Sequence, residues 1–180
     1  VIITSGIDLS VGSVLVFSSV VAAKVMEAMG GDGWGTALVG LLVALVVGMA
    51  WGTLNGFLVA KAKVPALIVT LGALSVALGL AQVITGGVDV RSAPEALTDF
   101  NTYIKIVGIP ALPFGALVTV IIGGVVLHKK KVGLYTYAIG SNELGARRVG
   151  IKVDRHLVMI YALSGLMAGF GAVLSLSQFG

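Results

Sequence analysis

The chain has 180 residues, of which 57% are hydrophobic and only 11% are charged. Soluble domains carry about 25% charged residues, so this chain has too little polar surface to cover a water-facing globule and is predicted to be a membrane protein. Its formal net charge of +4 does not indicate a nucleic-acid partner, because the basic residues flank apolar runs and are not interleaved with exposed aromatics. The absence of cysteine excludes a disulfide framework and a thiolate metal site.

The first residues predict a break between two helices. Residues 1–7 are apolar but too short to cross a bilayer, and we expect them to end a helix. Residues 6–13 then interrupt the helix and restart it, with Asp8 or Ser10 placed to cap the new one. Since apolar sequence runs up to both ends of the chain, we expect residues 1–180 to be part of a longer transmembrane domain that is truncated at both ends.

Five apolar segments are predicted to cross the membrane, for which a helix needs roughly 20 residues. The fold class is therefore all-α, a polytopic transmembrane helical bundle. Near the end of the first segment, Lys24 and Glu27 are three residues apart and can form an ion pair. The five predicted spans are Val11–Met29, residues 36–59, Ala66–Thr85, residues 114–127 with their flanks, and residues 157–179.

A longer polar loop over residues 86–113 separates the third and fourth spans. Within it, Ser92 and Glu95 have the spacing of a capping box, and Pro94 suits the first turn of a helix. This pattern predicts a short surface helix over residues 94–101.

Glycines recur at helical spacing in three of the predicted spans. Small residues let helix backbones approach closely in a bilayer, where lipid is as apolar as leucine. We expect these glycines to pack helices together within one subunit, and a seam between two subunits is the alternative. The glycines are Gly48, Gly52 and Gly56 in the second span, Gly72, Gly79 and Gly86 along the third, and Gly165 and Gly169 in the fifth.

The distribution of basic residues predicts the orientation of the spans. Cytoplasmic loops carry an excess of Lys and Arg, so the two basic loops should both face the cytoplasm. The turn after the first span and the loop over residues 86–113 then face outside. Nine of the twelve Lys and Arg residues lie in these two loops: Lys61, Lys63, Lys129, Lys130, Lys131, Arg147, Arg148, Lys152 and Arg155.

The only long polar run, residues 128–156, lies between the fourth and fifth spans and contains one predicted short helix over residues 141–150. Ser141 or Asn142 can cap its first N–H groups, and an acidic residue follows in the first turn. Two arginines occupy the last turn, and Gly150 supplies the left-handed stop. A helix of this length is not stable alone, so it must pack against the membrane surface or a partner protein.

Four sequence motifs, in the same order, resemble ribose/xylose-type ABC importer permeases over nearly the whole chain. Residues 135–153 resemble the cytoplasmic coupling segment of that family, whose usual pattern is Ala-Ile-Gly-x-Asn-x-x-Ala-Ala-Arg-x-x-Gly-Ile, with Gly145 here at one usual alanine. Residues 6–12 read Gly-Ile-Asp-Leu-Ser-Val-Gly, which resembles a further signature. Residues 52–61 and 64–72 are similar to the next two signatures.

The resemblance implies the partners and the coupling site. In that family the coupling helix docks on an ABC ATPase subunit at the cytoplasmic side, and a periplasmic or extracellular sugar-binding protein delivers the substrate. It also implies a second permease subunit in a homodimer, and a location in the bacterial plasma (inner) membrane among lipid. No cofactor is expected on the chain itself, because the partner subunit binds the ATP. By this resemblance the residues that contact the ATPase are Asn142, Glu143, Ala146, Arg147 and Gly150.

Polar residues within or beside the spans are the candidates for a substrate path. They are costly in lipid unless they find partners, and their alternative role is hydrogen bonding between helices or back to their own helix. For Asp8, the alternatives are a discontinuous helix that lines a polar path and an ordinary cap at the cytoplasmic mouth. The path candidates in the set are Asp8, Ser10, Asn55, Thr70 and Gln82.

No enzyme activity is predicted, since the sequence has no Walker A, His-Glu-x-x-His or Gly-x-Ser-x-Gly pattern and its eight acidic residues are scattered singly. We expect a permease subunit of an ABC importer, which moves a monosaccharide such as ribose or xylose by alternating access while a separate ATPase supplies the energy. Two alternatives remain: an ABC permease for another small solute (a branched-chain amino acid, a nucleoside or an autoinducer-like sugar), and an ion-coupled secondary transporter.

Overall fold

The computed structural model describes residues 1–88, 93–103, 105–106 and 109–179, and most of them are helical. A single antiparallel pairing, Lys105 opposite Pro110 and Ile106 opposite Ile109, joins α4 to α5. In chain order the elements are η1 (Ile2–Thr4), α1 (Val11–Met29), α2 (Trp34–Ala60), α3 (Ala66–Thr85), α4 (Glu95–Tyr103), β1 (Lys105–Ile106), β2 (Ile109–Pro110), α5 (Ala111–Lys129), α6 (Lys131–Ser141), α7 (Glu143–Arg148) and α8 (Val153–Phe179).

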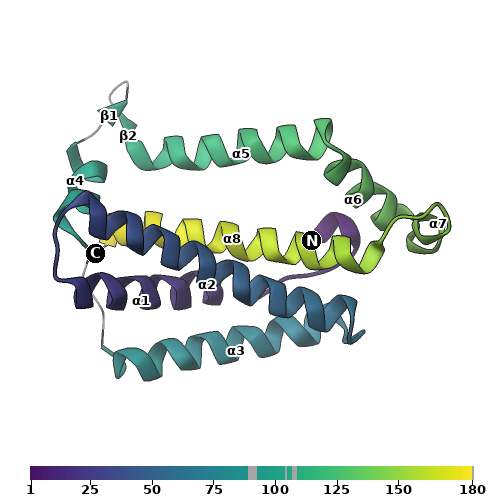
Figure 1. Cartoon of the computed structure of the whole chain (residues 1–180), viewed down its shortest axis with the longest axis horizontal. Helices are drawn as coiled ribbons and strands as arrows, with labels where there is room; N and C mark the ends of the chain where they lie inside the picture. Colours follow the sequence, from purple (N-terminus) through teal and green to yellow (C-terminus); the bar gives the residue numbers. More distant parts are fainter. Residues whose placement is uncertain (89–92, 104, 107–108, 180) are drawn as a thin grey trace.

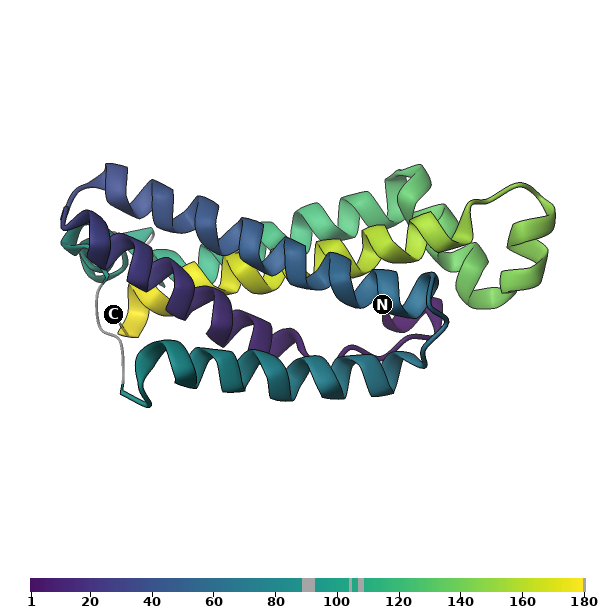
Figure 2. The same ribbon diagram turned by 60° about the horizontal axis from the view of Figure 1, so that its bottom comes forward.

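The long helices lie side by side and form an elongated bundle (Figure 1). Helices α1, α2 and α8 pack together, α3 lies against α1, and α5 is attached to the rest chiefly at its two ends. Figure 2 shows α3 running along one side of this group. Helices α6 and α7 project beyond the ends of the long helices (Figure 1).

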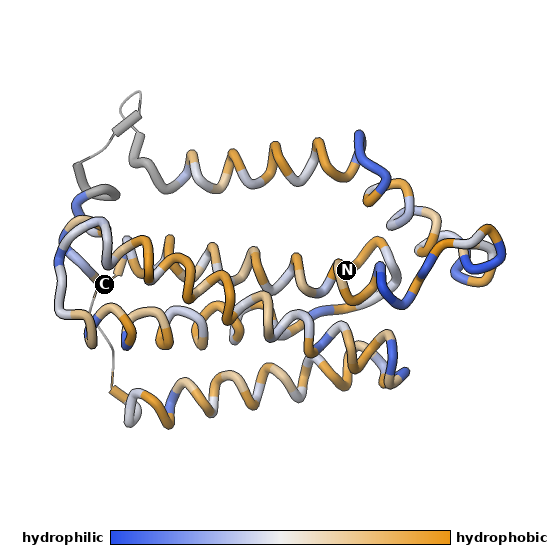
Figure 3. The backbone as a smooth tube through the Cα atoms, in the orientation of Figure 1, coloured by the Kyte–Doolittle hydropathy of each residue, from blue (hydrophilic) through white to orange (hydrophobic). Residues whose placement is uncertain are grey.

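Helices α1, α2, α3 and α8 are each long and apolar enough to cross a membrane, and a shorter apolar helix covers residues Pro113–Lys129 of α5. Hydrophobic residues fill the middle of these helices, and most hydrophilic residues gather at the end that carries α7 (Figure 3). We call this end, which carries the nine Lys and Arg residues of the two basic loops, the basic end. The prediction of a helical membrane bundle with about five spans is therefore confirmed.

The core contact of the bundle is the close packing of α2 against α8. A Cβ added at Gly52 would overlap the carbonyl oxygen of Tyr161, and one added at Gly165 would overlap that of Gly48. Gly169 lies in the same way against the Ala44 carbonyl oxygen. The glycines of the second and fifth spans therefore pack within one subunit, as predicted.

The prediction was wrong for the third span. A Cβ at Gly72, Gly79 or Gly86 would have no heavy atom within 4 Å in the described part of the chain. These glycines face outward from α3 and contact no other helix among the described residues.

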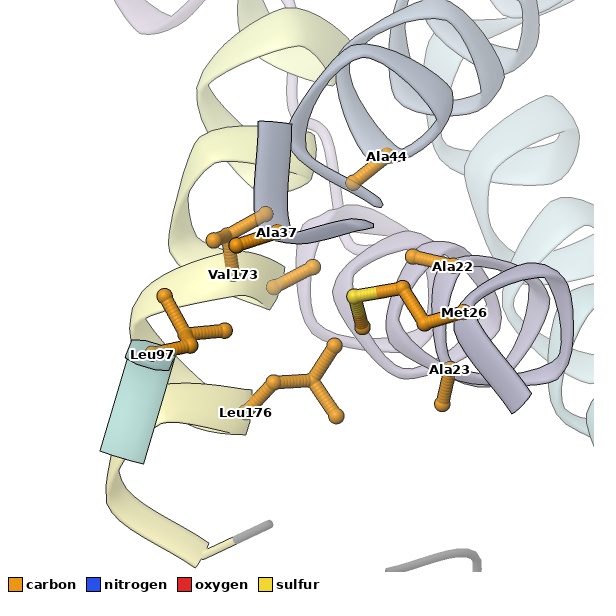
Figure 4. Packing of buried hydrophobic residues seen from close by; sticks show 9 residues of the cluster. Ala22, Ala23, Met26, Ala37, Ala44, Leu97, Val173 and Leu176 are labelled. Atoms are coloured by element: carbon orange, nitrogen blue, oxygen red, sulfur yellow. The ribbon is translucent and has the colours of Figure 1, made fainter. Parts of the chain in front are cut away.

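At the end opposite α7, small side chains and a few larger ones close the bundle (Figure 4). Ala22, Ala23 and Met26 of α1 meet Ala37 and Ala44 of α2 there. Leu97 of α4 and the α8 residues Val173 and Leu176 complete the cluster, so α4 covers this end of the core. The predicted surface helix thus exists, over Glu95–Tyr103, while its predicted cap Ser92 lies outside the described residues.

Two elements differ from the sequence expectation. Residues 1–7 do not form the end of an α-helix, because a single 3-10 turn over Ile2–Thr4 is followed by Ser5 with φ of 58° and then by non-helical chain. Helix α6 was not predicted at all. It turns sharply away from α5, which is possible because Gly133 lies directly against the carbonyl group of Leu127.

Candidate functional site

Helix α7 is short and is held in shape by its own polar residues. The Asn142 side chain caps it, since its Oδ1 accepts a hydrogen bond of 2.8 Å from the backbone N–H of Gly145. The Arg147 guanidinium donates to Glu143 Oε1 from Nε at 3.1 Å and from Nη2 at 2.9 Å, one helical turn away. Gly150 follows the helix with φ of 85°, a left-handed conformation that glycine adopts readily. The cap, the acid and base positions and the stop agree with the prediction.

A small apolar core fixes α7 to its neighbours. Ala146 is buried against Ile139 of α6 and Val153 of α8, with Ile151 and Leu157 packed around them. Ala146 therefore supports the helix from inside, whereas Asn142, Glu143, Arg147 and Gly150 lie at the surface.

Helix α6 is itself fixed to α8 by a buried hydrogen bond. The Thr136 hydroxyl donates to the carbonyl of Val132 at 2.8 Å, so it accepts from Nε2 of His156 at 2.9 Å. The ring of His156 also meets Tyr135 edge-on. The α6–α7 unit is thus joined to the first turns of α8 by both apolar and polar contacts.

A network of ion pairs joins α7, the start of α8 and the turn after α2. Asp154 in the first turn of α8 accepts from Arg147 Nη2 at 2.5 Å and from Lys63 Nζ at 3.0 Å. The hydrogen bonds to Asp154 and Glu143 raise the pKa of Arg147 above its usual value, so the guanidinium stays charged. Because Lys63 follows α2 and Asp154 begins α8, the two basic loops lie at the same end of the bundle, as predicted from charge.

Two apolar side chains on the surface of the α7 segment were missed by the sequence reading. Leu144 is 70% exposed and Val149 is 77% exposed, although both are surrounded by charged residues at the projecting tip. The sequence shows a leucine within a charged, capped helix. It does not show that this leucine is exposed, because that depends on which face of the helix Ala146 buries. Exposed apolar side chains with a polar rim are typical of a protein–protein contact.

The break before α1 holds a second polar group, inside the bundle. Asp8 Oδ1 accepts from the backbone N–H of Ser10 at 3.1 Å and from its hydroxyl at 2.7 Å. Asp8 Oδ2 accepts from the Ser164 hydroxyl at 3.0 Å, and Asn55 Nδ2 donates to Ser10 Oγ at 2.9 Å. The Asp8 cluster (Asp8, Ser10, Asn55 and Ser164) therefore links the break to both α2 and α8.

Two further groups meet at this break. The buried Thr70 hydroxyl of α3 is 3.3 Å from the carbonyl oxygen of Ile7 and 3.5 Å from that of Leu67. The hydroxyl of Tyr161 is buried next to Gly6 and has no hydrogen-bond partner among the described residues. The break thus receives side chains from α2, α3 and α8.

The Asp8 cluster lies deeper than the mouth of the bundle. Ser164 comes 11 residues after Val153, where α8 begins, which is about 16 Å along the helix axis. Helix α1 has 19 residues and α2 has 27, so α1 begins short of the end that α2 reaches. The predicted cap is wrong, because the N-cap of α1 is Ser10 and no side chain bonds to the first turn of the helix. Asp8 instead holds Ser10, at a position within the span region and not at its rim.

Gln82 does not belong to this group. It lies near the other end of α3, three residues before the helix ends at Thr85, and its side chain is exposed. The structure therefore brings together four of the five path candidates and leaves Gln82 apart. Ser164 and Tyr161 were missed, because nothing in the local sequence places a residue of the last span beside the first.

We expect removal of the Asp8 carboxylate to weaken the fold. In an Asp8→Ala variant, three donors (the Ser10 N–H, the Ser10 hydroxyl and the Ser164 hydroxyl) lose their acceptor, which costs about 3 kcal/mol. The measurement is the thermal unfolding midpoint in detergent. Asp32→Ala is the control, since that carboxylate is exposed in a turn, and an equal effect of the two changes would contradict a role for the cluster.

A large apolar cavity lies elsewhere in the bundle and does not include the cluster. It has a volume of about 890 Å³ and lies between α5 and α8. The hydroxyls of Thr119, Thr136 and Ser177 on its wall donate to carbonyls of their own helices. Such a wall offers few hydrogen bonds to a sugar. Among the described residues, no three His, Asp or Glu side chains are grouped closely enough to hold a metal ion.

Comparison with known proteins identifies the family. The family of branched-chain amino acid transport system permease components matches residues 1–180. A probable ABC transporter permease of Sinorhizobium fredii is 37% identical over 98% of this chain and 51% of its own length. The ribose import permease of Escherichia coli is 35% identical, over 99% of this chain and 55% of its own. The autoinducer 2 import system permease of Yersinia enterocolitica is 33% identical, over 100% and 48%.

The chain spans about half the length of the curated relatives that it matches. No solved structure matches it. The match along all 180 residues nevertheless covers both the projecting α7 and the Asp8 cluster, and it agrees with the helical membrane bundle. This chain belongs to the branched-chain amino acid transport system permease family.

Proposed function

We propose that the chain acts as the transmembrane permease subunit of an ABC importer, which moves a monosaccharide such as ribose or xylose by alternating access. The observation that carries the proposal is α7, a helix capped by Asn142 and fixed rigidly beyond the ends of the spans by Ala146 and the Arg147–Asp154 pair. A rigidly attached helix transmits a push to α8 and α6, whereas a flexible loop would absorb it. The similarity to a ribose import permease supports the substrate class.

In this proposal, α7 docks on a separate ATPase subunit at the cytoplasmic side. Asn142, Glu143, Arg147 and Gly150 lie on its surface, and Ala146 holds the helix in place from within. The exposed side chain of Leu144 supplies an apolar anchor. The ATPase binds the ATP, so the permease itself requires no cofactor.

The other partners follow from the same proposal. A periplasmic or extracellular sugar-binding protein delivers the substrate at the end opposite the basic end, and a second copy of the permease completes a homodimer in the bacterial inner membrane. The basic end faces the cytoplasm, in accordance with the excess of Lys and Arg there.

For the substrate path, we propose that the break before α1 is where the path is closed. Ser10, Asn55 and Thr70 are fully enclosed, and their hydrogen bonds to the break hold α1, α2 and α3 together. Opening toward the cytoplasm would expose these groups and Asp8 to a sugar, whose hydroxyls can replace the protein partners. Gln82 would contact the substrate separately, nearer the outer end of α3.

Reconstitution in liposomes tests the proposed function. Vesicles that contain the permease, the ATPase and enclosed ATP, with the binding protein outside, should accumulate radiolabelled ribose. Uptake should persist after ionophores collapse the ion gradients and should stop when the ATPase is omitted. Uptake without the ATPase, driven by an ion gradient, would establish a secondary transporter instead.

A second substrate class is favoured by a specific observation, the similarity to an autoinducer 2 import permease. The same vesicles distinguish the two substrates, because each is supplied with its own binding protein. Uptake of the autoinducer but not of ribose would replace the proposed monosaccharide while retaining the ABC mechanism. Branched-chain amino acids and nucleosides are tested in the same way.

A further inference from the structure

A small pocket opens at the basic end, where the turn after α2 meets the start of α8. Its volume is about 320 Å³, at the lower limit of the roughly 300–1,000 Å³ of ligand pockets. Four of the side chains that line it are cationic: Lys61, Arg147, Lys152 and Arg155. Among the described residues that line it, only Asp154 is acidic.

Asp154 does not neutralise this pocket. Its carboxylate already pairs with Arg147 on one side and with Lys63, which lies outside the pocket lining, on the other. Lys61, Lys152 and Arg155 have no ion-pair partner among the residues that the structure describes. The pocket is therefore strongly positive and is arranged to receive an anion.

The pocket lies at the level of the lipid headgroups. Lys61 directly follows Ala60, the last residue of the apolar helix α2, and Arg155 precedes the apolar run of α8 by one residue, His156. All three free cations are thus within one turn of helix segments long enough to cross the membrane. Helix α7, by contrast, projects further from the bundle (Figure 1).

We infer that this pocket binds the phosphate headgroup of an anionic phospholipid in the leaflet at the basic end. A phosphodiester provides several acceptor oxygens, which suit an arginine and two lysines from separate segments. Bound there, the lipid would bridge the turn after α2 and the first turn of α8, the same two segments that Lys63 and Asp154 join. The inference depends on membrane insertion but not on the transported solute or on the ATPase.

Titration with short-chain phosphatidylglycerol, followed by native mass spectrometry of the purified protein, tests the site. The variant Lys61→Gln/Lys152→Gln/Arg155→Gln should bind the lipid at least roughly tenfold more weakly, since each cation near the membrane surface changes binding by about fivefold. The matched control is Lys129→Gln/Lys130→Gln/Lys131→Gln, which removes the same charge at the same end. It should weaken lipid binding less than the pocket variant does, because none of these three lysines lines the pocket. All three side chains of the first variant are exposed, and thermal unfolding verifies that it is folded.

Four results would overturn the inference. Equal weakening in both variants would show general attraction to the surface, and an unchanged affinity in the pocket variant would show that the lipid binds elsewhere. Inorganic phosphate that binds as tightly as the lipid would identify a soluble anion as the ligand. If the pocket variant keeps its lipid but no longer co-purifies with the ATPase, the pocket is a protein contact.

Discussion

Changing Leu144 to glutamate should abolish ATP-driven uptake while leaving the protein folded in the membrane. Leu144 is 70% exposed in the first turn of α7, so a carboxylate there is solvated in the free permease. In the docked complex the same carboxylate would be buried in an apolar contact without a partner, which typically costs 2 kcal/mol or more, about a thirtyfold loss of affinity. The readouts are ribose uptake in vesicles and co-purification with the ATPase.

The control for this prediction is Lys129→Gln, which makes the charge at the basic end more negative by the same one unit. It should leave uptake near normal, because Lys129 ends α5 and is remote from α7 in the chain. A Leu144→Glu protein that retains the ATPase and transports normally would exclude α7 as the docking element. Equal loss in both proteins would attribute the effect to overall charge.

The spans were predictable because their ends are marked locally. Helices α1 and α3 have the predicted bounds, since Gly30 and Gly86 end them in left-handed conformations and Pro65 precedes the start of α3. Helices α2 and α8 are longer than predicted. Helix α8 begins four residues before the apolar run, at Val153, because its polar first turn is held by the ion pairs of Asp154.

Helix α6 was not predictable in the same way. It contains two glycines, which lower helix propensity. Polar residues also interrupt its apolar residues, so the sequence shows no clear helical pattern. Both glycines are used for tertiary contacts: Gly133 lies on the Leu127 carbonyl and Gly140 on that of Ile3. Helix α6 is therefore stabilised by contacts with other segments and not by the helix propensity of its own residues.

In the candidate sites, too, contacts between residues close in the sequence differ from contacts between distant residues. The Asn142 cap, the Glu143–Arg147 pair and the Asp8–Ser10 turn each join residues at most four apart. Their spacing is local, although only the cap at Asn142 was predicted. The bonds that place them in the fold span far longer separations. Asp8 and Ser164 are 156 residues apart and Lys63 and Asp154 are 91 apart, so a single sequence gives no signal for either pair.

Replacing Gly52 with leucine should prevent folding of the bundle. A Cβ at this position would overlap the Tyr161 carbonyl oxygen and lie 3.0 Å from the backbone nitrogen of Gly165. The obstacle is the backbone of α8, which cannot move aside as a side chain would, so α2 and α8 must separate along their length. Overpacking of a core costs 1–3 kcal/mol where the neighbours are side chains, and a larger cost is expected against backbone.

Two further variants, Gly52→Ala and Gly72→Leu, test whether the contact with α8 causes the effect. The alanine variant adds only the overlapping Cβ and should lower the thermal unfolding midpoint, even though alanine favours a helix over glycine by about 1 kcal/mol. Gly72→Leu adds its side chain at a position where a Cβ meets no heavy atom of the described residues within 4 Å, so it should leave the midpoint unchanged or raise it. Because both glycines are in apolar helices of similar hydropathy, only the contact with α8 distinguishes them. A Gly52→Ala protein as stable as the unmodified one would show that α2 and α8 do not meet through their glycines.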